Sequence, residues 1–258
     1  MKSGSRGVGA RLAIVTGGTS GIGWGFARAL AAAGTDLLIV ARDRGQLSAA
    51  CRYIETDFGV SAYPCAADLS LREGVAEVTE ALHRLGRHAC YLVNSAGSGS
   101  PQRFEDTPWS SLARLVDLHC HATANLCHVV IPEMRRRGFG RIINIASLSA
   151  TISLAGEQEM YSASKAFVIR LSSSLNRRLK SEGVYVTAVC PGLTRTRFHV
   201  NDGTAERVRR IPGIIWLEPD AVAAQSLRWN ERGRELLVPG RINNLVYHLL
   251  RKRFGIVG

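Results

Sequence analysis

Short apolar runs alternate with amphipathic stretches along the chain. The apolar runs are continuous and are bounded by glycine, proline or aspartate, which is typical of strands buried on both faces. The predicted strands cover residues 11–17, 36–42, 61–68, 90–97, 140–147, 184–192 and 234–240. The predicted helices, in which apolar residues recur every three or four positions, cover residues 24–34, 44–56, 71–85, 108–137 and 161–182.

Strands and helices that alternate at this interval form βαβ units, and these build a parallel sheet. The sequence therefore predicts an α/β protein with a doubly wound, Rossmann-type sheet of seven parallel strands and helices on both faces. The chain of 258 residues shows no linker or internal repeat, so we expect a single domain over residues 1–258. Within it, residues 11–197 are predicted to form the cofactor-binding and catalytic core.

Two segments depart from the alternation. Residues 198–220 form a long connection beyond the carboxyl end of the sixth strand, where a substrate lid would lie. Residues 241–258 predict a C-terminal amphipathic helix, because aliphatic residues recur every three or four positions. These residues are Ile242, Leu245, Val246, Leu249 and Leu250, and they are followed by Arg251, Lys252 and Arg253. We expect the apolar side either to pack on the core or a second subunit, or to lie on an anionic membrane.

The composition is ordinary for a soluble globular protein, with 46% hydrophobic and 21% charged residues. No apolar run approaches the roughly 20 residues that span a bilayer, and the basic N-terminal segment lacks the hydrophobic stretch of a secretory signal. The six cysteines show no CxxC spacing, which indicates free thiols in a reducing compartment. We therefore expect a cytoplasmic protein.

The formal net charge of +12 would suit a phosphate-rich ligand, a nucleic acid or an anionic membrane. The positive residues are spread along the chain, with the densest runs at 135–137, 207–210 and 251–253. Solvated surface charge explains such runs, and we find no recognition motif or basic patch with interleaved aromatic residues. We expect no nucleic-acid partner.

A glycine-rich turn, "TGGTSGIG" at residues 16–23, follows the first predicted strand and precedes a helix. Glycines allow a tight turn and let the backbone approach a pyrophosphate, which then lies at the amino end of the helix. The strand–turn–helix context distinguishes this turn from an ordinary loop. The turn residues predicted to bind a dinucleotide are Gly17, Thr19, Ser20, Gly21, Ile22 and Gly23.

The end of the second predicted strand bears on the choice of nucleotide. An acidic residue there commonly accepts a hydrogen bond from the ribose 2′-hydroxyl of NAD, but this chain has Ala41 followed by Arg42. A guanidinium pairs with a 2′-phosphate, and no carboxylate repels it. Arg42 therefore favours NADP(H), with NAD and an ordinary surface arginine as the alternative.

A tyrosine and a lysine lie four positions apart in "MYSASKAF", where a helix is predicted. Tyr161 and Lys165 therefore share one helical face. A nearby ammonium favours the phenolate and lowers the pKa of a tyrosine from its usual value of about 10. Tyr161 is then suited to donate or accept a proton near neutral pH.

Together these motifs resemble the short-chain dehydrogenase/reductase family over residues 11–240. The family's TGxxxGxG turn is matched by Thr16, Gly17, Gly21 and Gly23, and its YxxxK motif by Tyr161 and Lys165. Its NNAG motif is matched by Asn94, Ala96 and Gly97, with Ser95 as the one departure, and its PG-xxx-T segment by Pro191, Gly192 and Thr196. Asp68 and Leu69 match the pair that contacts adenine in relatives. The segment "LLVPGRINNLVYHLL" resembles the branch that includes 17β-hydroxysteroid dehydrogenases and 3-ketoacyl reductases.

The resemblance implies a catalytic serine after the fifth strand. Relatives usually carry it at a set interval before the tyrosine, and that position is Leu148 here. Ser147, at the end of "INIAS", is the better candidate because it aligns with the end of the strand, and Ser149 is the second.

The resemblance also implies a mechanism. Ser147 would hold the substrate carbonyl oxygen, Tyr161 would give it a proton during reduction, and Lys165 would lower the pKa of the tyrosine and hydrogen-bond the nicotinamide ribose. Thr194 and Thr196 would contact the nicotinamide end. The hydride comes from the cofactor, so we expect no metal.

The stretch "HCH" at residues 119–121 contains three side chains that can bind a metal, and it lies in the helix predicted over 108–137. His119 and His121 lie about 200° apart around such a helix, so they cannot hold one ion, and His121 is expected at the surface. The resemblance places His119 where most relatives carry an asparagine that holds a water beside the catalytic lysine. An imidazole also donates and accepts hydrogen bonds, so His119 is predicted to join the catalytic site, with a pH dependence that asparagine lacks. The alternative is that it only fills space.

The sequence therefore predicts an NADP(H)-dependent oxidoreductase that reduces a ketone to an alcohol, or catalyses the reverse reaction. Apolar residues of the lid favour an apolar or 3-ketoacyl substrate, although they would equally suit packing on the sheet. They are Ile211, Ile214, Ile215, Trp216 and Leu217. The alternative is a non-catalytic NADP(H)-binding regulatory or scaffold protein. By the resemblance, we also expect a homodimer or homotetramer.

Overall fold

The computed structural model describes residues 11–99, 104–151, 159–198 and 211–254, and its centre is a sheet in the order β3-β2-β1-β4-β5-β6-β7. The strands are β1 (Leu12–Thr16), β2 (Asp36–Ala41), β3 (Ala62–Ala66), β4 (Ala89–Asn94), β5 (Gly140–Ile145), β6 (Val184–Val189) and β7 (Leu236–Leu237). All neighbouring strands are parallel. The chain starts near the middle of the sheet, runs to one edge and returns to build the other, which confirms the doubly wound prediction.

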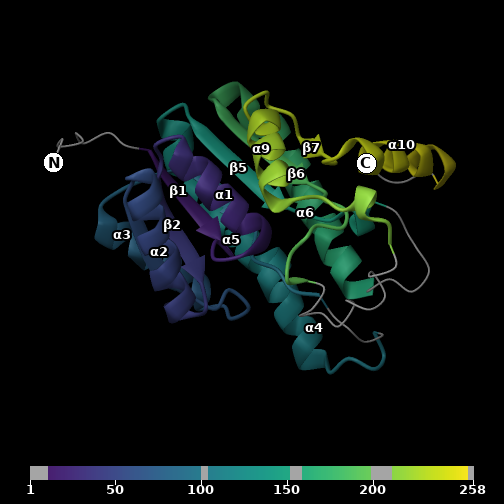
Figure 1. The fold of residues 1–258 in the computed structure, drawn as a ribbon, viewed down its shortest axis with the longest axis horizontal. Coiled ribbons are helices and arrows are strands. Elements are labelled where there is room, and N and C mark those ends of the chain that lie inside the picture. Colours follow the sequence, from purple (N-terminus) through teal and green to yellow (C-terminus); the bar gives the residue numbers. More distant parts are fainter. Residues whose placement is uncertain (1–10, 100–103, 152–158, 199–210, 255–258) are drawn as a thin grey trace.

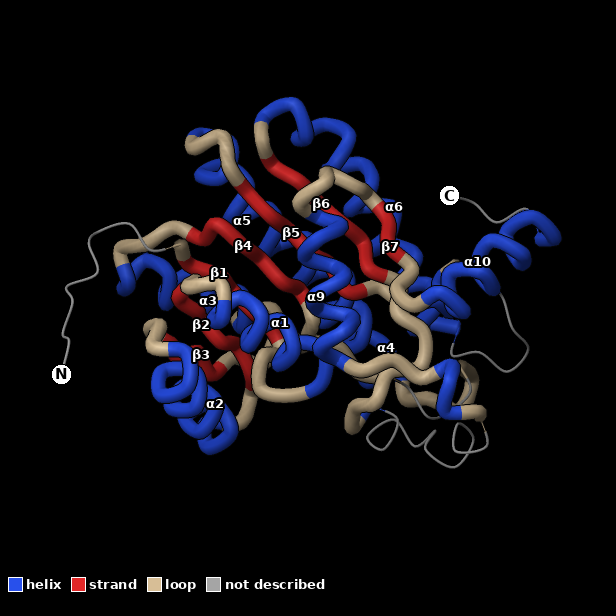
Figure 2. Tube along the Cα trace, turned by 45° about the horizontal axis from the view of Figure 1, so that its top comes forward, coloured by secondary structure: helices blue, strands red, loops and turns tan. Residues whose placement is uncertain are grey.

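Helices cover both faces of this sheet (Figures 1 and 2). They are α1 (Gly21–Ala32), α2 (Arg44–Phe58), α3 (Gly74–Leu85), α4 (Trp109–Val116), α5 (Ala122–Arg136), α6 (Glu159–Leu179), α9 (Pro219–Asn230) and α10 (Arg241–Phe254). Phe26 of α1 and Leu47 of α2 are buried in one core cluster, which α9 also joins, and Val78 of α3 and Leu126 of α5 in the other. All residues of β1 and β5 are buried, as their continuous apolar runs predict.

The observed elements differ from the predicted ones mainly at their ends. The helix α1 begins at Gly21 rather than residue 24, and the strand predicted over 234–240 contains only the two residues of β7. The helix predicted over 108–137 is present, but a π-helical turn, η1 (Asp117–His121), separates α4 from α5. The helix α9 was not predicted, because its first residues were assigned to the lid.

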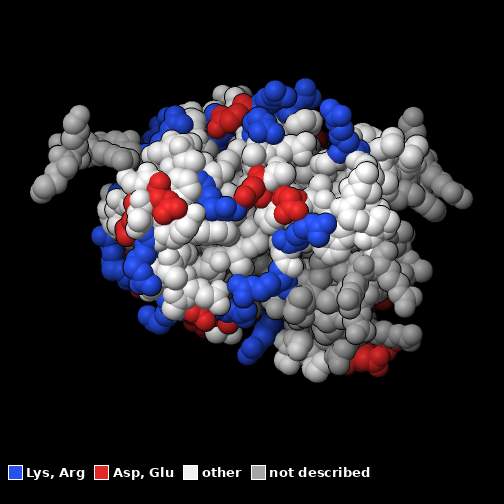
Figure 3. All heavy atoms as spheres, in the orientation of Figure 1, with Lys and Arg blue, Asp and Glu red and all other residues white. Residues whose placement is uncertain are grey.

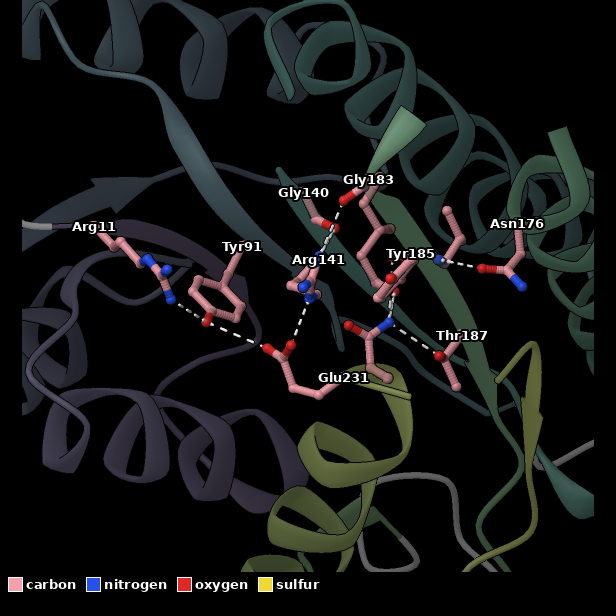
Figure 4. A network of polar contacts seen from close by, with 12 residues as sticks. Arg11, Tyr91, Gly140, Arg141, Asn176, Gly183, Tyr185, Thr187 and Glu231 are labelled. Carbon is pink, nitrogen blue, oxygen red and sulfur yellow. Dashed lines mark hydrogen bonds and ion pairs between the residues drawn. The ribbon is translucent and has the colours of Figure 1, made fainter. Parts of the chain in front are cut away.

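A polar network joins the end of α9 to the amino half of the sheet (Figure 4). Asn230, the last residue of α9, is 1% exposed. Its amide nitrogen donates to the carbonyl oxygens of Ile142 and Tyr185 at 3.0 and 3.2 Å and lies 2.9 Å from Oγ1 of Thr187. These bonds attach α9 to two adjacent strands, β5 and β6.

The buried Arg141 of β5 extends this network. Its Nε donates to Glu231 at 2.8 Å, and its Nη1 donates to the carbonyl oxygens of Gly140 and Gly183 at 2.9 and 3.0 Å. The Tyr91 hydroxyl donates to the other oxygen of Glu231 at 3.5 Å. These residues lie at the amino ends of the strands. They link the strands at the end of the sheet that lies opposite to the predicted site.

The C-terminal helix α10 contacts the protein through polar and aromatic residues and not through its aliphatic side. Asn243 and Tyr247 are buried. The aliphatic residues Ile242, Leu245, Val246 and Leu249 are exposed. Of the alternatives that the sequence left open, packing of the aliphatic side on the protein's own core is therefore wrong for the described part of this helix, and a second subunit or a membrane stays a prediction.

Basic and acidic side chains are interspersed on the face that Figure 3 shows, and the basic ones do not gather into one patch there. Among the described helices we find none that combines the length and the apolar character needed to cross a bilayer. All six cysteines are free thiols, and four of them are buried.

Candidate active site

The glycine-rich turn between β1 and α1 forms a cradle of exposed backbone. Gly17 and Gly21 have φ angles of +63° and +53°, a region that favours glycine over residues with a side chain. A Cβ atom on Gly23 would lie 2.3 Å from the carbonyl oxygen of Gly17, so only glycine fits there. The Ser20 side chain makes no capping hydrogen bond in the described structure, which leaves the amino end of α1 open to an anion.

A cavity of about 570 Å³ opens at this amino end. Its lining includes Thr19, Ser20, Gly21 and Thr196, together with Trp24, Arg28, Arg195 and Trp216. The first four were predicted as cofactor-binding residues. Trp216 was predicted as a residue of the substrate lid. The sequence reasoning missed Trp24, Arg28 and Arg195, because single aromatic and basic residues of this kind give no motif. The arginines of the lining and the open helix end suit an anionic group such as the pyrophosphate of a dinucleotide.

The end of β4 is fixed against this turn by Thr16. The Oγ1 atom of Thr16 accepts the backbone N–H groups of Ser95 and Ala96, both at 3.0 Å. Asn94 is buried and donates through its amide to Asn144 at 2.8 Å. The side chain of Asn94 thus ties β4 to β5, and the backbone of the next residues lies beside the cradle.

Arg42 and Asp68 lie at the carboxyl ends of β2 and β3. Arg42 is exposed, and Leu69 beside Asp68 is buried in the core. Burial acts to raise the pKa of Asp68, but hydrogen bonds from Ser70 and the positive charges of Arg42 and Arg114 outweigh it and lower that pKa. The backbone N–H of Ala67 donates to the carbonyl oxygen of Ala41 at 3.0 Å, so the two segments predicted to meet the adenosine end lie side by side.

Tyr161 and Lys165 lie in the first turns of α6. The Lys165 side chain is 5% exposed, its Nζ donates to the carbonyl oxygen of Ile145 at 2.9 Å, and it lies 5.8 Å from the centroid of the Tyr161 ring. Burial lowers the pKa of Lys165 to about 8, against the opposing influence of two cysteine thiols. The pair thus places a desolvated ammonium beside a phenol at the end of β5.

Ser147 follows β5 directly and begins the short turn η2 (Leu148–Ala150). Its Oγ accepts the backbone N–H of Ser149 at 3.2 Å and lies 2.9 Å from the Ser149 hydroxyl. The backbone on either side is held to β6 and its extension, because Ala146 donates to Val189 and Leu148 donates to Pro191. Ser147 and Ser149, the two candidates for the catalytic serine, are therefore hydrogen-bonded to each other.

His119 is 1% exposed and lies between the Tyr161 ring and the loop after β4. Its Nδ1 lies 2.9 Å from Oγ of Ser164, and its Nε2 accepts the backbone N–H of Ser98 at 3.2 Å. The imidazole meets the Tyr161 ring edge to face with centroids 5.5 Å apart. Burial, with help from the positive charge of Lys165, lowers the pKa of His119 well below 6.5.

Ser98 and Ser164 were missed by the sequence reasoning, because single serines in a loop and on a helix carry no periodic signal. His121 is partly exposed, and both nitrogens of His119 are engaged with protein groups. Among the described residues, no group of three or more histidines, cysteines or acids is arranged to hold a metal ion. Gly97 completes the wall of the site, since a Cβ there would lie 3.2 Å from Nε2 of His119 and 3.5 Å from Nζ of Lys165.

The segment after β6 lies beside the cradle. Thr194 is buried and donates to the carbonyl oxygen of Gly192 at 3.0 Å, and Thr196 contacts the position that a Cβ on Gly21 would occupy. The part of the predicted lid at 199–210 lies outside the described residues. Its last part is attached to this segment, because backbone bonds join Leu217 to residues 193 and 195.

The matched residues fit a nicotinamide dinucleotide. The glycine turn and the open end of α1 would hold the pyrophosphate, and Arg42 with Asp68 would flank the adenosine. The Tyr161–Lys165 pair lies at the carboxyl ends of the central strands, where ligands bind in such sheets. A family model described as short chain dehydrogenase matches residues 11–207. The chain belongs to the short-chain dehydrogenase family.

Short-chain dehydrogenases are oxidoreductases that bind a nicotinamide cofactor and a small-molecule substrate. The chain is 33% identical over 227 residues to the rhamnolipids biosynthesis 3-oxoacyl-[acyl-carrier-protein] reductase of Pseudomonas aeruginosa, covering 84% of this chain and 88% of that protein. It is 32% identical over 197 residues to the mouse very-long-chain 3-oxoacyl-CoA reductase, covering 74% of this chain and 62% of that protein. It is 31% identical over 215 residues to the mouse inactive hydroxysteroid dehydrogenase-like protein 1, covering 81% of this chain and 62% of that protein.

Among solved structures, the short-chain dehydrogenase from Sphingobium yanoikuyae in complex with NADPH superposes with a TM-score of 0.82. It is 31% identical, and the match covers 95% of this chain and 94% of that chain. The L-sorbose reductase from Gluconobacter frateurii, complexed with NADPH and L-sorbose, superposes with a TM-score of 0.78 at 26% identity, covering 91% and 97% of the two chains. Two structural relatives of this short-chain dehydrogenase therefore hold NADPH.

Proposed function

We propose that this short-chain dehydrogenase uses NADP(H) to interconvert a ketone and an alcohol, with Tyr161 as the proton donor during reduction. The observation that carries the proposal is the buried Lys165, which lies 5.8 Å from the Tyr161 ring centroid and is fixed by Ile145. A desolvated positive charge at this place stabilises negative charge on the tyrosine oxygen.

Ser147 would hold the carbonyl oxygen of the substrate. Its Oγ already accepts the Ser149 N–H. Either hydroxyl can donate in the bond between Ser147 and Ser149, and donation by Ser149 would leave the Ser147 proton free to point toward the carbonyl oxygen. Lys165 would hydrogen-bond the nicotinamide ribose. When bound, NADPH supplies the hydride, while the protein positions the carbonyl and moves one proton.

His119 would act as a positioning residue. Its imidazole supports one face of the Tyr161 ring and holds the loop after β4 through Ser98. Both nitrogens are engaged, so we propose that it orders the tyrosine and the wall near Gly97 rather than passing protons itself. Loss of this support would lower kcat more than it changes the KM for the ketone.

Arg42 supports the preference for NADP(H). It is exposed at the end of β2, next to Asp68, and no acidic residue stands at position 41 or 42 to repel a 2′-phosphate. The NADPH-bound relatives agree with this choice of cofactor.

An apolar ketone or a 3-ketoacyl thioester is the proposed substrate class. Two relatives are named as 3-oxoacyl reductases, one acting on a carrier-protein ester and one on a CoA ester. Residues 198–220 would form the lid over the substrate, and residues 211–217 contribute apolar side chains to it. A homo-oligomer is proposed as well, since Trp109 and Phe167 expose 68% and 42% of their area on α4 and α6.

The proposal is tested by measuring NADPH oxidation with a panel of ketones, aldehydes and 3-ketoacyl thioesters. Tyr161→Phe should lower kcat by about 10²–10⁴-fold while the dissociation constant for NADPH stays within about twofold. Tyr53→Phe, at an exposed tyrosine on α2, is the control and should behave like the wild type. Unchanged turnover in Tyr161→Phe would contradict the mechanism.

A non-catalytic NADP(H)-binding role is the second candidate. The similarity to a mouse protein named as inactive favours it, whereas the presence of Ser147, Tyr161 and Lys165 argues against it. Protein that binds NADPH tightly but oxidises it with no member of the panel would establish the second candidate.

A further inference from the structure

The helix α10 exposes an aliphatic stripe, defined as Ile242, Leu245, Val246 and Leu249. These side chains are 37%, 59%, 37% and 60% exposed. The opposite side of the helix carries Asn243 and Tyr247, which are 4% and 5% exposed and attach the helix to the protein. The most apolar side of α10 is thus turned away from the rest of the chain.

The attachment lies in the first half of the helix. A Cβ atom on Gly192 would lie 2.9 Å from the Asn243 side chain, so Asn243 occupies the space that the glycine leaves, and Tyr247 belongs to a buried cluster with Val168 and Cys190. Figures 1 and 2 show α10 extending from β7 away from the sheet. The stripe therefore lies on a projecting element that a flat surface can reach.

The charge of this region is mainly positive. The helix contains no aspartate or glutamate, it starts at the exposed Arg241, and its last turn includes Arg251, Lys252 and Arg253. From residue 232 to the C-terminus the sequence contains six lysines and arginines and one acid, Glu235. An aliphatic stripe flanked by cations suits an apolar layer bordered by anions.

We propose that α10 docks on a membrane surface that contains anionic lipids, with the aliphatic stripe in the acyl layer and the flanking cations among the headgroups. The helix of 14 residues is about 21 Å long, so it would lie in the interface plane rather than cross the bilayer. The docking depends on this surface alone and holds whatever reaction the protein catalyses.

A second copy of the chain fits the stripe less well. One side of a helix of this length and about 10 Å width covers about 200 Å², against the roughly 800 Å² that each partner buries in a standard interface. Two copies of α10 packed in a parallel or an antiparallel way would also bring cations together, and the helix contains no carboxylate to pair with them. Charge complementarity therefore favours anionic lipid over a second α10.

Docking would bring the membrane close to the substrate lid. A Cβ on Gly240, just before α10, would lie 2.6 Å from the Leu217 side chain, and Leu217 belongs to the predicted lid. A substrate dissolved in the lipid would then have a short path to the site.

The test uses the full-length protein and vesicles of phosphatidylcholine, with or without 30% phosphatidylglycerol, in a co-sedimentation assay. We expect binding to the anionic vesicles to be at least tenfold stronger than to the neutral ones and to weaken with salt. The double variant Leu245→Ser/Leu249→Ser should bind the anionic vesicles at least tenfold more weakly. Phe104→Ser, at a 45% exposed residue before α4, is the matched control and should bind like the wild type.

Both serine variants change exposed side chains, so they should keep the melting temperature and the NADPH affinity of the wild type. Equal binding to neutral and anionic vesicles, or no loss in the double variant, would overturn the proposal. Light scattering measures the oligomeric state of each variant. A wild-type dimer that dissociates only in the double variant would assign the stripe to a second copy of the chain and would also overturn the membrane proposal.

Discussion

The Nδ1 atom of His119 lies 2.9 Å from the Oγ atom of Ser164, where the π-helical turn packs on α6. The Ser164 hydroxyl donates its only proton to the carbonyl oxygen of Tyr161 at 2.7 Å, so it accepts from Nδ1. The Nε2 atom in turn accepts the N–H of Ser98. This network assigns the neutral, Nδ1-protonated tautomer to His119.

Acid should destabilise the protein through His119. Burial, with the positive charge of Lys165, holds the pKa of His119 well below 6.5. Below pH 6.5 the unfolded chain binds a proton here that the folded protein does not bind, so stability is lost as the pH falls. Between pH 7 and pH 5, His119→Asn should lose up to about 2 kcal/mol less of its free energy of unfolding than the wild type. Urea denaturation at the two pH values measures the difference.

The matched control is His121→Asn, which removes a partly exposed histidine two positions away and should retain the acid-dependent loss. The His119→Asn variant should also lower kcat several-fold with little change in the KM for the ketone, because Tyr161 loses the ring that packs against it. If His119→Asn loses as much stability between pH 7 and pH 5 as the wild type does, burial of His119 is not the cause of the acid-dependent loss.

Lys165→Met should make the protein more stable and inactive. Burial lowers the pKa of Lys165 to about 8, and the distance from its usual value of 10.5 corresponds to about 3 kcal/mol of destabilisation at pH 7. The substitution also removes the hydrogen bond that Lys165 donates to the carbonyl oxygen of Ile145, which costs about 1–2 kcal/mol of stability. The net gain in the free energy of unfolding should therefore be about 1–2 kcal/mol. Guanidinium denaturation at pH 7 measures it.

The sign of the pH dependence separates this effect from better packing. Between pH 8 and pH 10.5 the folded Lys165 loses its proton before the unfolded chain does, so the wild type gains stability and the advantage of Lys165→Met shrinks. An advantage that stays constant over this range would mean that packing, not charge, is responsible. Lys180→Met, at an exposed lysine, should change stability by less than about 0.5 kcal/mol.

Arg42→Asp should change the preference from NADPH toward NADH. The substitution removes a cation from the predicted 2′-phosphate position and adds a repelling carboxylate, so kcat/KM with NADPH should fall by about 10–100-fold. The carboxylate can accept a hydrogen bond from the ribose of NADH, so kcat/KM with NADH should rise. Arg44→Asp, two positions later and also exposed, should leave the ratio within about threefold. A ratio unchanged by Arg42→Asp would assign cofactor choice elsewhere.

Local patterns were enough to predict the sheet and the cofactor cradle. Each buried parallel strand is a continuous apolar run. The turn depends on the positive φ angles of Gly17 and Gly21 and on the close approach of the backbone at Gly23, which glycine alone allows. The spacing of Tyr161 and Lys165 likewise fixes their shared face. These features depend on residues close together in sequence.

Features that depend on distant contacts could not be predicted. The buried side of α10 is decided by Asn243 filling the space beside Gly192, although the aliphatic stripe is the stronger sequence pattern. The role of Ser164 depends on a histidine 45 positions earlier. The anchoring of α9 through Asn230 depends on acceptors in two strands far away in the sequence.

Arg141→Met should destabilise the protein without changing the cofactor site. The guanidinium of Arg141 lies between the rings of Phe139 and Tyr185, 4.2 and 4.3 Å from their centroids, and pairs with Glu231 at 2.8 Å. Methionine keeps much of the stacking but removes the ion pair with Glu231 and one donor from each of two carbonyl oxygens, so the free energy of unfolding should fall by about 2–3 kcal/mol. Because these groups lie at the amino ends of the strands, the NADPH dissociation constant should stay within about twofold. Arg170→Met, at an exposed arginine of α6, should cost less than about 0.5 kcal/mol, and an equal loss in both variants would mean that the network adds no stability of its own.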